Sequence, residues 1–352
     1  MDVLKWVRPN ILKLKPYSSA RDEFSGEAMV FLDANENPFN KPFNRYPDPM
    51  SRELKNKIAA LKGISADRIF LGNGSDEPID LIIRLFCEPG IHNIVTFEPT
   101  YGMYQVAADI HHIEVLKLKL TADYQLDAEE LLNTVNENTR VIFLCSPNNP
   151  TGNALDEQVI LKIVTEFDGM VVLDEAYIDF APEYSWLSRL DEFPNLIILQ
   201  TLSKAWGMAG IRLGMAFSQP EVIGLLNKIK YPYNLNILTQ QKALELLENE
   251  DQKDSWVRLL LEEKRKLEQA LHGIPFVKKV FPSDANFLLV KMDDAESVYQ
   301  YLIQKGIVVR DRSRVMLCES SLRITVGTPE ENRILIEALR GFVKEKGTRN
   351  KK

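Results

Sequence analysis

The chain of 352 residues has no long apolar run and only three cysteines. No stretch approaches the ~18 apolar residues of a membrane span, and residues 1–5 do not begin a secretory signal. The cysteines, Cys87, Cys145 and Cys318, are widely separated, odd in number and in apolar surroundings, which favours buried free thiols in a reducing compartment over disulfides. We therefore expect a cytoplasmic protein.

Three other kinds of signal are also missing. The four histidines form no metal-ligand pattern, so we expect no metal. The net charge of −7 argues against general nucleic-acid affinity. The chain lacks both a Gly-x-Gly-x-x-Gly after its first strand and a Gly-x-x-x-x-Gly-Lys-[Ser/Thr], which argues against a nucleotide-binding α/β protein.

Apolar runs alternate with helical patterns from about residue 45 to residue 250, which is typical of an α/β domain. After an N-terminal arm over 1–30, we expect a large domain over 31–250, with a mostly parallel sheet wrapped by helices. The expected strands are 94–98, 113–118, 140–145, 170–174, 196–200 and 212–217. The expected helices are near 51–62, 77–87, 155–167 and 219–230.

The remainder, residues 251–352, is expected to be a smaller α+β domain, and a long helical pattern over 245–272 would bridge the two domains. Its expected strands are 277–280, 286–291, 308–310 and 322–326, with helices near 294–305 and 329–345.

Lys204 directly follows the strand expected at 196–200 and lies in the segment TLSKAWGMAGIRLG, residues 201–214. Open α/β sheets bind ligands at the carboxyl ends of their strands. An amine desolvated there loses part of its proton affinity and can attack an aldehyde. A lysine in such a place is more often a solvated surface charge, so the interpretation depends on three further motifs.

Two of these motifs also follow apolar runs. CSPNNPTG, residues 145–152, predicts a tight turn after a strand, and MVVLDEAYID, residues 170–179, places Asp174 at a strand end with Tyr177 three residues beyond. The plainer interpretations are a strand-to-helix loop for the first and a turn or helix cap for the acid of the second.

The third motif, LGNGSDEP at residues 71–78, leads into the helical apolar periodicity of residues 79–86. Gly74, Ser75 and Asp76 would present free backbone N–H groups and the positive end of a helix dipole to an anion. Ordinary helix starts look similar, so this motif alone is a weak phosphate signal.

Together the motifs provide what pyridoxal 5'-phosphate requires. The N–H groups of residues 74–76, the Ser203 hydroxyl and Arg212 suit its phosphate. A buried Asp174 would hold the proton on the ring nitrogen, which lets the cofactor act as an electron sink.

Three further residues suit the other groups of the cofactor. Asn149 and Tyr177 would donate hydrogen bonds to its phenolic oxygen. Tyr101, in FEPTY at residues 97–101, would stack on the ring.

With these motifs in this order, the chain resembles the fold-type I, aspartate-aminotransferase-like family of pyridoxal-phosphate enzymes, from about residue 33 to residue 343. The resemblance implies that Lys204 carries the cofactor covalently and moves the substrate proton. It also implies that Asp174 and Tyr177 belong to the catalytic set.

Two arginines are candidates for binding the substrate. Arg323 interrupts the otherwise apolar strand in SLRITVGT, residues 321–328, and a buried arginine needs an anion. A salt bridge within the chain is one explanation, and in the resembled family the arginine at this place binds the α-carboxylate of the amino acid. Arg310 opens the run RDRSR, residues 310–314, which would usually be a solvated loop, but two arginines on neighbouring strands could clamp a dianion.

Within that family the chain is most similar to the histidinol-phosphate aminotransferases. The segments that carry this similarity are DANENP at 33–38, RYPDP at 45–49, GNGSDE at 72–77 and LRITVGT at 322–328. The similarity implies a homodimer in which Tyr46 reaches the cofactor phosphate of the partner subunit. It also implies that Tyr17, Asn35, Arg310 and Arg323 shape the substrate pocket.

We therefore expect a homodimeric transaminase that exchanges the amino group of L-histidinol phosphate with 2-oxoglutarate, giving imidazole acetol phosphate and L-glutamate, and that has no nucleic-acid or membrane partner. An aromatic amino acid aminotransferase or a threonine-phosphate decarboxylase of the same fold would use the same motifs. A transaminase-like regulator would need a DNA-binding segment, for which an arm of about 30 residues is too short.

Overall fold

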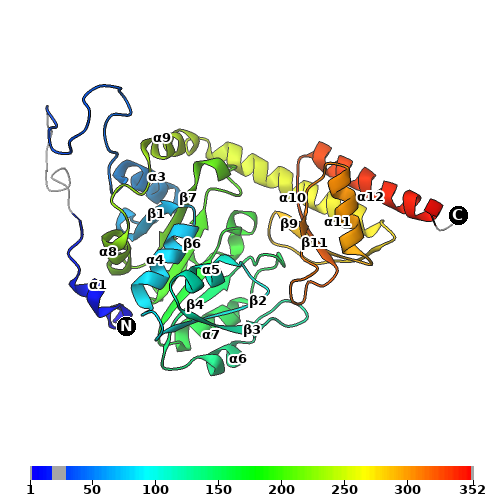
Figure 1. The fold of residues 1–352 in the computed structure, drawn as a ribbon, viewed down its shortest axis with the longest axis horizontal. Helices are drawn as coiled ribbons and strands as arrows, with labels where there is room; N and C mark the ends of the chain where they lie inside the picture. Colours follow the sequence, from blue (N-terminus) through cyan, green and yellow to red (C-terminus); the bar gives the residue numbers. More distant parts are fainter. Residues whose placement is uncertain (1, 18–28, 350–352) are drawn as a thin grey trace.

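The computed structural model describes residues 2–17 and 29–349, with side chains to residue 343. The chain forms a seven-stranded and a four-stranded sheet, joined by a long helix (Figure 1). In these described ranges, no helix combines the length and the apolar character needed to span a membrane. Of the expected arm over 1–30, residue 1 and residues 18–28 lie outside the described part.

The large sheet has the strand order β1-β7-β6-β5-β4-β2-β3. Adjacent strands run parallel from β6 to β3, whereas β7 is antiparallel to both of its neighbours. The expectation of a mostly parallel sheet is confirmed, and each strand expected here is present to within one residue. The strands are β1 (Ile69–Asn73), β2 (Asn93–Glu98), β3 (Glu114–Lys119), β4 (Thr139–Cys145), β5 (Met170–Asp174), β6 (Leu196–Thr201) and β7 (Leu213–Phe217).

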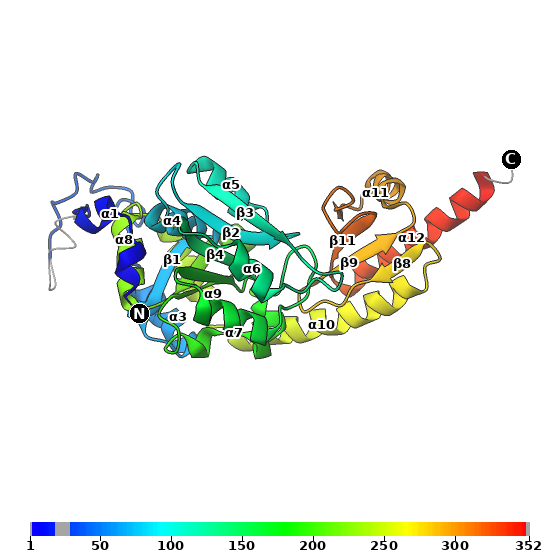
Figure 2. The same cartoon turned by 90° about the horizontal axis from the view of Figure 1, so that it is seen from below.

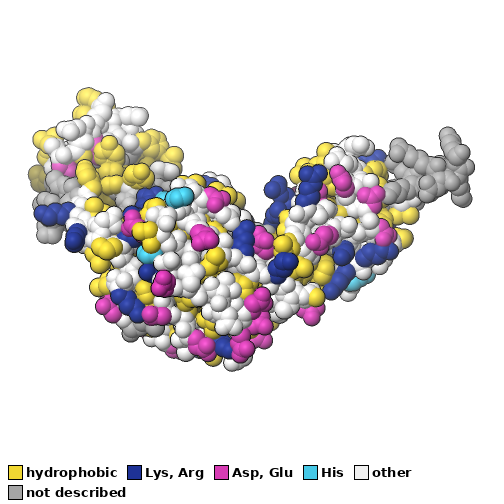
Figure 3. All heavy atoms as spheres, turned by 60° about the horizontal axis from the view of Figure 1, so that its bottom comes forward, with side chains coloured by type: hydrophobic (Ala, Val, Ile, Leu, Met, Phe, Trp, Pro, Cys, Tyr) yellow, Lys and Arg dark blue, Asp and Glu magenta, His cyan; other side chains and the backbone are white. Residues whose placement is uncertain are grey.

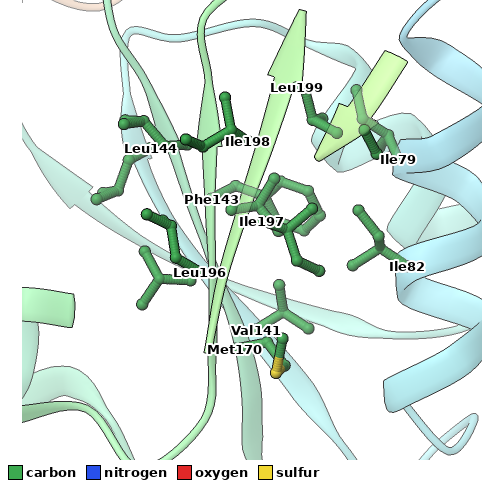
Figure 4. Packing of buried hydrophobic residues seen from close by; sticks show 14 of the residues in the cluster. Ile79, Ile82, Val141, Phe143, Leu144, Met170, Leu196, Ile197, Ile198 and Leu199 are labelled. Atoms are coloured by element: carbon green, nitrogen blue, oxygen red, sulfur yellow. The ribbon is translucent and has the colours of Figure 1, made fainter. Parts of the chain in front are cut away.

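Apolar residues on both faces of the central strands form the main core. Every residue of β5 and β6 is buried, because helices cover both sides of a parallel sheet. Helix α4 (Asp76–Phe86) contributes Ile79 and Ile82, which face Phe143 and Leu199 of the sheet in Figure 4. The other helices of this part are α3 (Arg52–Lys62), α5 (Met103–Ile110), α6 (Ala128–Thr134), α7 (Glu157–Glu166), α8 (Pro220–Ile229) and α9 (Ile237–Leu246).

Four elements of this part were not predicted from the sequence, namely β1, α5, α6 and, apart from its last two residues, α9. Strand β1 contains Gly72, and the pattern around it indicates a loop; its pairing with β7 stabilises it as a strand. Helices α5 and α6 have only eight and seven residues, too short for a clear helical periodicity. Single 3₁₀ turns are η1 (Val3–Trp6), η2 (Ala66–Arg68), η3 (Ile178–Phe180), η4 (Pro182–Tyr184), η5 (Leu187–Arg189) and η6 (Ala209–Ile211).

Helix α10 (Glu250–His272) connects the two sheets, as Figure 2 shows. The single helical pattern expected over 245–272 is in fact broken between α9 and α10, where Asn249 leaves the helical conformation at φ −105° and ψ 51°. The bridging role expected for this segment therefore belongs to α10 alone.

The small sheet is antiparallel, in the order β10-β11-β9-β8. It packs with α10, α11 (Ala295–Gln304) and α12 (Pro329–Arg349) around a second hydrophobic core. The strand expected at 308–310 forms only at residues 310–311, and Val308 is exposed. The strands are β8 (Val277–Val280), β9 (Phe287–Met292), β10 (Arg310–Asp311) and β11 (Ser321–Thr325).

The described N-terminal residues run along the outside of the large part. Helix α1 (Pro9–Lys13) packs through Ile11, whereas many apolar side chains between residues 29 and 46 are exposed. Met29 is 99% and Leu32 is 91% exposed, and Figure 3 shows apolar side chains gathered at this end of the molecule. Exposed apolar side chains gathered in this way are typical of a protein–protein contact.

Candidate active site

A cavity of about 720 Å³ lies between the two sheets. One wall comes from the carboxyl ends of large-sheet strands and the loops that follow them, and the other from β10, β11 and their loop. Figure 3 shows the surface hollowed between the two parts, with Lys and Arg side chains on the small-sheet side. We call these surfaces the large-sheet wall, with Gly74, Asp76, Asp174, Lys204 and Arg212, and the small-sheet wall, with Arg310, Arg312 and Arg323.

One end of the large-sheet wall has the features of an anion-binding site. Ser75 precedes α4 and makes no side-chain capping bond, so the first N–H groups of the helix lack that partner. The Arg212 carbonyl accepts a hydrogen bond from the Gly74 N–H at 2.9 Å. A Cβ on Gly74 would lie 2.6 Å from the Arg212 guanidinium, so only glycine lets this cation approach the helix start.

Asp76, Tyr101 and Arg212 form a polar group at the same end. The Tyr101 hydroxyl donates to Asp76 Oδ1 at 2.9 Å, and an Arg212 guanidinium nitrogen lies 3.5 Å from Asp76 Oδ2. Ser203 also lines the cavity, and the Thr201 hydroxyl donates to its Oγ at 3.0 Å. The sequence motifs at residues 74–76, 101, 203 and 212, which are far apart in the chain, therefore meet in one place.

Lys204 lies just beyond the end of β6, as its motif predicts. Its Nζ is 5.4 Å from the centre of the Tyr177 ring. The side chain is exposed to the open cavity, but the surrounding walls still displace much of its hydration. Burial, followed by repulsion from Arg323, lowers the pKa of the Lys204 amine, which favours the neutral nucleophile.

Asp174 ends β5 and is 2% exposed. Its Oδ2 accepts a hydrogen bond from the Tyr104 hydroxyl at 2.6 Å, and its Oδ1 accepts one from the Ala176 N–H at 3.1 Å. Burial raises the pKa of Asp174 to about 6, whereas the two hydrogen bonds act in the opposite direction. A buried carboxylate so placed can stabilise a cationic ring nitrogen in the cavity.

Tyr104 was not predicted as a site residue. It is completely buried, stacks on Phe143 with ring centres 4.9 Å apart, and lies behind Asp174 rather than in the cavity. The motif FEPTY stops three residues before it, and no local pattern indicates that its hydroxyl meets an acid 70 residues further along the chain.

Asn149 and Tyr177 line the cavity, as expected, and connect its two walls. The Asn149 side-chain oxygen accepts a hydrogen bond from Arg323, which leaves its NH₂ group as the free donor toward a ligand. The Tyr177 ring packs edge-on against Phe287 of β9, with ring centres 5.1 Å apart.

The small-sheet wall contains the two expected arginines and a third. Arg310 and Arg323 lie directly opposite each other in the β10–β11 pair. Arg312 is not among the predicted site residues, because the run RDRSR is typical of a solvated loop; the alternation Arg-x-Arg, which places both side chains on one face of a strand, is the signal that indicates it. In the described part of the chain, none of the three guanidinium groups forms an ion pair with a carboxylate.

Tyr17, Asn35 and Tyr46 do not line this cavity. Tyr17 is 71% exposed, and Asn35 is exposed with φ 54°. Tyr46 is 50% exposed and stacks on Tyr233, with ring centres 4.5 Å apart. Their assignment to the site stays a prediction.

The site and the fold are typical of an aminotransferase, and the comparison with known sequences agrees with this class. The aminotransferase class I and II family profile matches residues 30–339, and the chain belongs to that family. It is 59% identical over 341 residues to the histidinol-phosphate aminotransferase of Parabacteroides distasonis, which covers 97% of this chain and 99% of that protein.

Solved structures agree with the architecture. The histidinol-phosphate aminotransferase of Clostridium acetobutylicum superposes with a TM-score of 0.80 at 25% identity, covering 87% of this chain and 92% of that one. The enzyme of the same name from Sinorhizobium meliloti, in complex with pyridoxal-5'-phosphate, gives a TM-score of 0.78 at 25% identity, with 85% and 83% covered. The expected aspartate-aminotransferase-like fold is confirmed.

Proposed function

We propose that this chain is a pyridoxal-phosphate-dependent transaminase that moves the amino group of L-histidinol phosphate to 2-oxoglutarate, giving imidazole acetol phosphate and L-glutamate in histidine biosynthesis. The observation that carries the proposal is one cavity that holds a lysine amine, a buried carboxylate and, on its small-sheet wall, three arginines that form no ion pair with the described residues. The near-full-length similarity to relatives of that name supports the substrate assignment.

The residues present fit pyridoxal phosphate. The start of α4, Ser203 and Arg212 suit its phosphate, and the absence of a side chain at Gly74 leaves room beside the guanidinium. Asp174 suits the ring nitrogen, and Asn149 and Tyr177 suit the phenolic oxygen.

When bound, the cofactor supplies an aldehyde for covalent attachment and a conjugated ring that withdraws electrons from the substrate. The protein residues supply the rest. The Lys204 amine, with its lowered pKa, would hold the cofactor and, once displaced, would take the proton from the substrate carbon and deliver it to the cofactor carbon that carried the aldehyde. Asp174 would stabilise a positive charge on the ring nitrogen, and Tyr101 and Tyr177, which line the same cavity, would confine the ring.

The small-sheet wall suits both substrates. Histidinol phosphate has a phosphate and no carboxylate, whereas glutamate has two carboxylates. Guanidinium groups match either oxyanion through paired N–H donors. Arginines without a carboxylate partner can therefore bind the anionic groups of the two substrates in turn.

A half-reaction assay tests this function. Adding histidinol phosphate to the cofactor-loaded protein should change the visible absorbance of the cofactor, and 2-oxoglutarate should restore it. An aromatic amino acid or threonine phosphate added as a competitor tests the two alternative activities of this fold. A faster response to either competitor, or carbon dioxide release from threonine phosphate, would contradict the proposed substrate.

The proposed assembly is a homodimer, with Tyr46 reaching the cofactor phosphate of the partner subunit. The exposed apolar side chains between residues 29 and 46 support such an interface. We further propose a division into an arm, a large domain over 31–250 and a small domain over 251–352, which the two sheets and the start of α10 support. Three buried free thiols support the proposed cytoplasmic location.

A further inference from the structure

Arg312 lies on the small-sheet wall, beside the residues already assigned to the substrate. Its N–H donates to the Ser321 carbonyl at 2.9 Å, which continues the β10–β11 ladder by one residue. Side chains alternate along a strand, so Arg310 and Arg312 share the face on which Arg323 lies opposite Arg310. The backbone thus directs three guanidinium groups to one end of the cavity.

These three cations are not neutralised within the described chain. The Nε atoms of Arg312 and Arg323 are buried and have no hydrogen-bond partner among the described residues. By contrast, Arg84 and Arg333, which lie elsewhere in the described chain, are each 2.6 Å from a carboxylate oxygen.

Such an arrangement is unfavourable without a ligand. Like charges opposite each other in a strand pair repel, and a buried donor without a partner destabilises the fold. In accord with this, burial and the nearby Arg323 and Arg310 lower the pKa of Arg312. A bound anion would remove both penalties.

We propose that Arg312 is a specificity-determining residue that binds the phosphate group of the amino substrate and favours it over a carboxylate. This inference rests on the proposed function. A phosphate ester carries a charge near −2 at neutral pH and has three acceptor oxygens, whereas a carboxylate carries −1 and has two. Arg310 and Arg323 are enough for the smaller anion, so Arg312 acts mainly on the larger one.

The test compares Arg312→Gln with the wild-type protein, using the cofactor-loaded dimer. Losing one charged hydrogen-bonding partner should raise KM for histidinol phosphate by about tenfold or more, with glutamate affected less than about threefold. Inorganic phosphate, titrated by calorimetry, should bind more weakly to the variant by a similar factor. Arg314→Gln is the matched control, because Arg314 belongs to the same charged run but is exposed and does not line the cavity.

The outcomes separate this inference from the proposed function. If the wild-type protein does not turn over histidinol phosphate, the proposed function fails. If it does, an equal effect of Arg312→Gln on both substrates, or no effect on either, overturns the role of Arg312. Unchanged phosphate binding would overturn it as well. A melting temperature and cofactor absorbance matching the wild type exclude misfolding as the cause of a loss.

Discussion

The two walls of the cavity differ in how their charges are satisfied. On the large-sheet wall, Asp174 accepts hydrogen bonds from Tyr104 and Ala176, and Asp76 contacts both Tyr101 and Arg212. On the small-sheet wall, three guanidinium groups face the cavity, with no carboxylate pairing them among the described residues.

We infer from this difference that the large-sheet wall suits a cofactor that stays bound, whereas the small-sheet wall suits substrates that bind and leave. Satisfied polar groups hold a fixed geometry, which chemistry at a bound cofactor requires. Cations without partners bind an incoming anion without first breaking an internal ion pair, so they suit substrates that must enter and leave. Substitutions on the large-sheet wall should therefore affect mainly turnover, and those on the small-sheet wall mainly substrate affinity.

The largest effect is expected from Lys204→Ala. The variant should keep the fold and bind the cofactor noncovalently, but turnover should fall by at least ~10³-fold because both the attachment point and the proton-transfer base are lost. Borohydride reduction of the wild-type protein, followed by peptide mass mapping, should place the cofactor on Lys204. An adduct on Lys228 or Lys230 instead would contradict the assignment.

Asp174→Asn should come next. The amide keeps the size of the side chain but removes the charge that stabilises a protonated ring nitrogen, so the amino-transfer step should slow by at least ~10²-fold. Single-turnover measurements separate this step from substrate binding. Near-normal turnover would show that Asp174 only forms the turn after β5.

On the small-sheet wall, Arg323→Ala should weaken both histidinol phosphate and glutamate by roughly 1.5–3 kcal/mol, through KM more than kcat. Arg310→Ala should weaken the phosphate substrate more than glutamate, because a dianion loses more when a cation is removed. Steady-state kinetics with each substrate provide the measurement. If both variants reduced kcat and left KM unchanged, the proposed difference between the walls would be wrong.

The sequence predicts the residues of the large-sheet wall better than those of the small-sheet wall. The reason is the distance along the chain between the residues whose contacts place each site residue. Residues 149, 174 and 204 belong to short motifs after predicted strands, so their convergence follows from the parallel sheet. Residues 74–76 are indicated instead by the start of α4, because β1 before them was not predicted. Arg312 depends on a strand extension formed by pairing with β11, which the charged run did not indicate. Tyr104 depends on α5, a helix too short to be predicted.

A third group of residues shows a different limit of prediction from the sequence. The prediction for Tyr17, Asn35 and Tyr46 rests on family resemblance, and in the single chain they do not line the cavity. Contacts between two chains leave no periodic signal in either one, so neither strand nor helix patterns can test this group.

Subunit exchange tests whether the large-sheet wall is completed by a second copy. In a heterodimer of Lys204→Ala and Tyr46→Phe chains, one site has both defects and the other has neither if Tyr46 acts across the interface. Mixing equal amounts should then recover about a quarter of wild-type activity, because about half of the dimers are mixed and each has one intact site. No recovery, with heterodimers confirmed by mass, would place Tyr46 in the site of its own subunit.

The smallest effect is expected from Tyr104→Phe, which tests whether the Tyr104 hydroxyl helps to keep Asp174 on the large-sheet wall ionised. Phenylalanine keeps the stacking on Phe143 but removes the hydrogen bond that lowers the pKa of Asp174. Since that pKa is about 6, removing the donor should raise it further, so the carboxyl group becomes protonated at a higher pH. Cofactor affinity of the apoprotein, measured by fluorescence from pH 5 to pH 8, should therefore begin to fall at a higher pH in the variant. It should be nearly unchanged at pH 8, where Asp174 is ionised in both proteins. A uniform loss at every pH would instead indicate disturbed packing around Phe143 and no role for Tyr104 in setting the charge of Asp174.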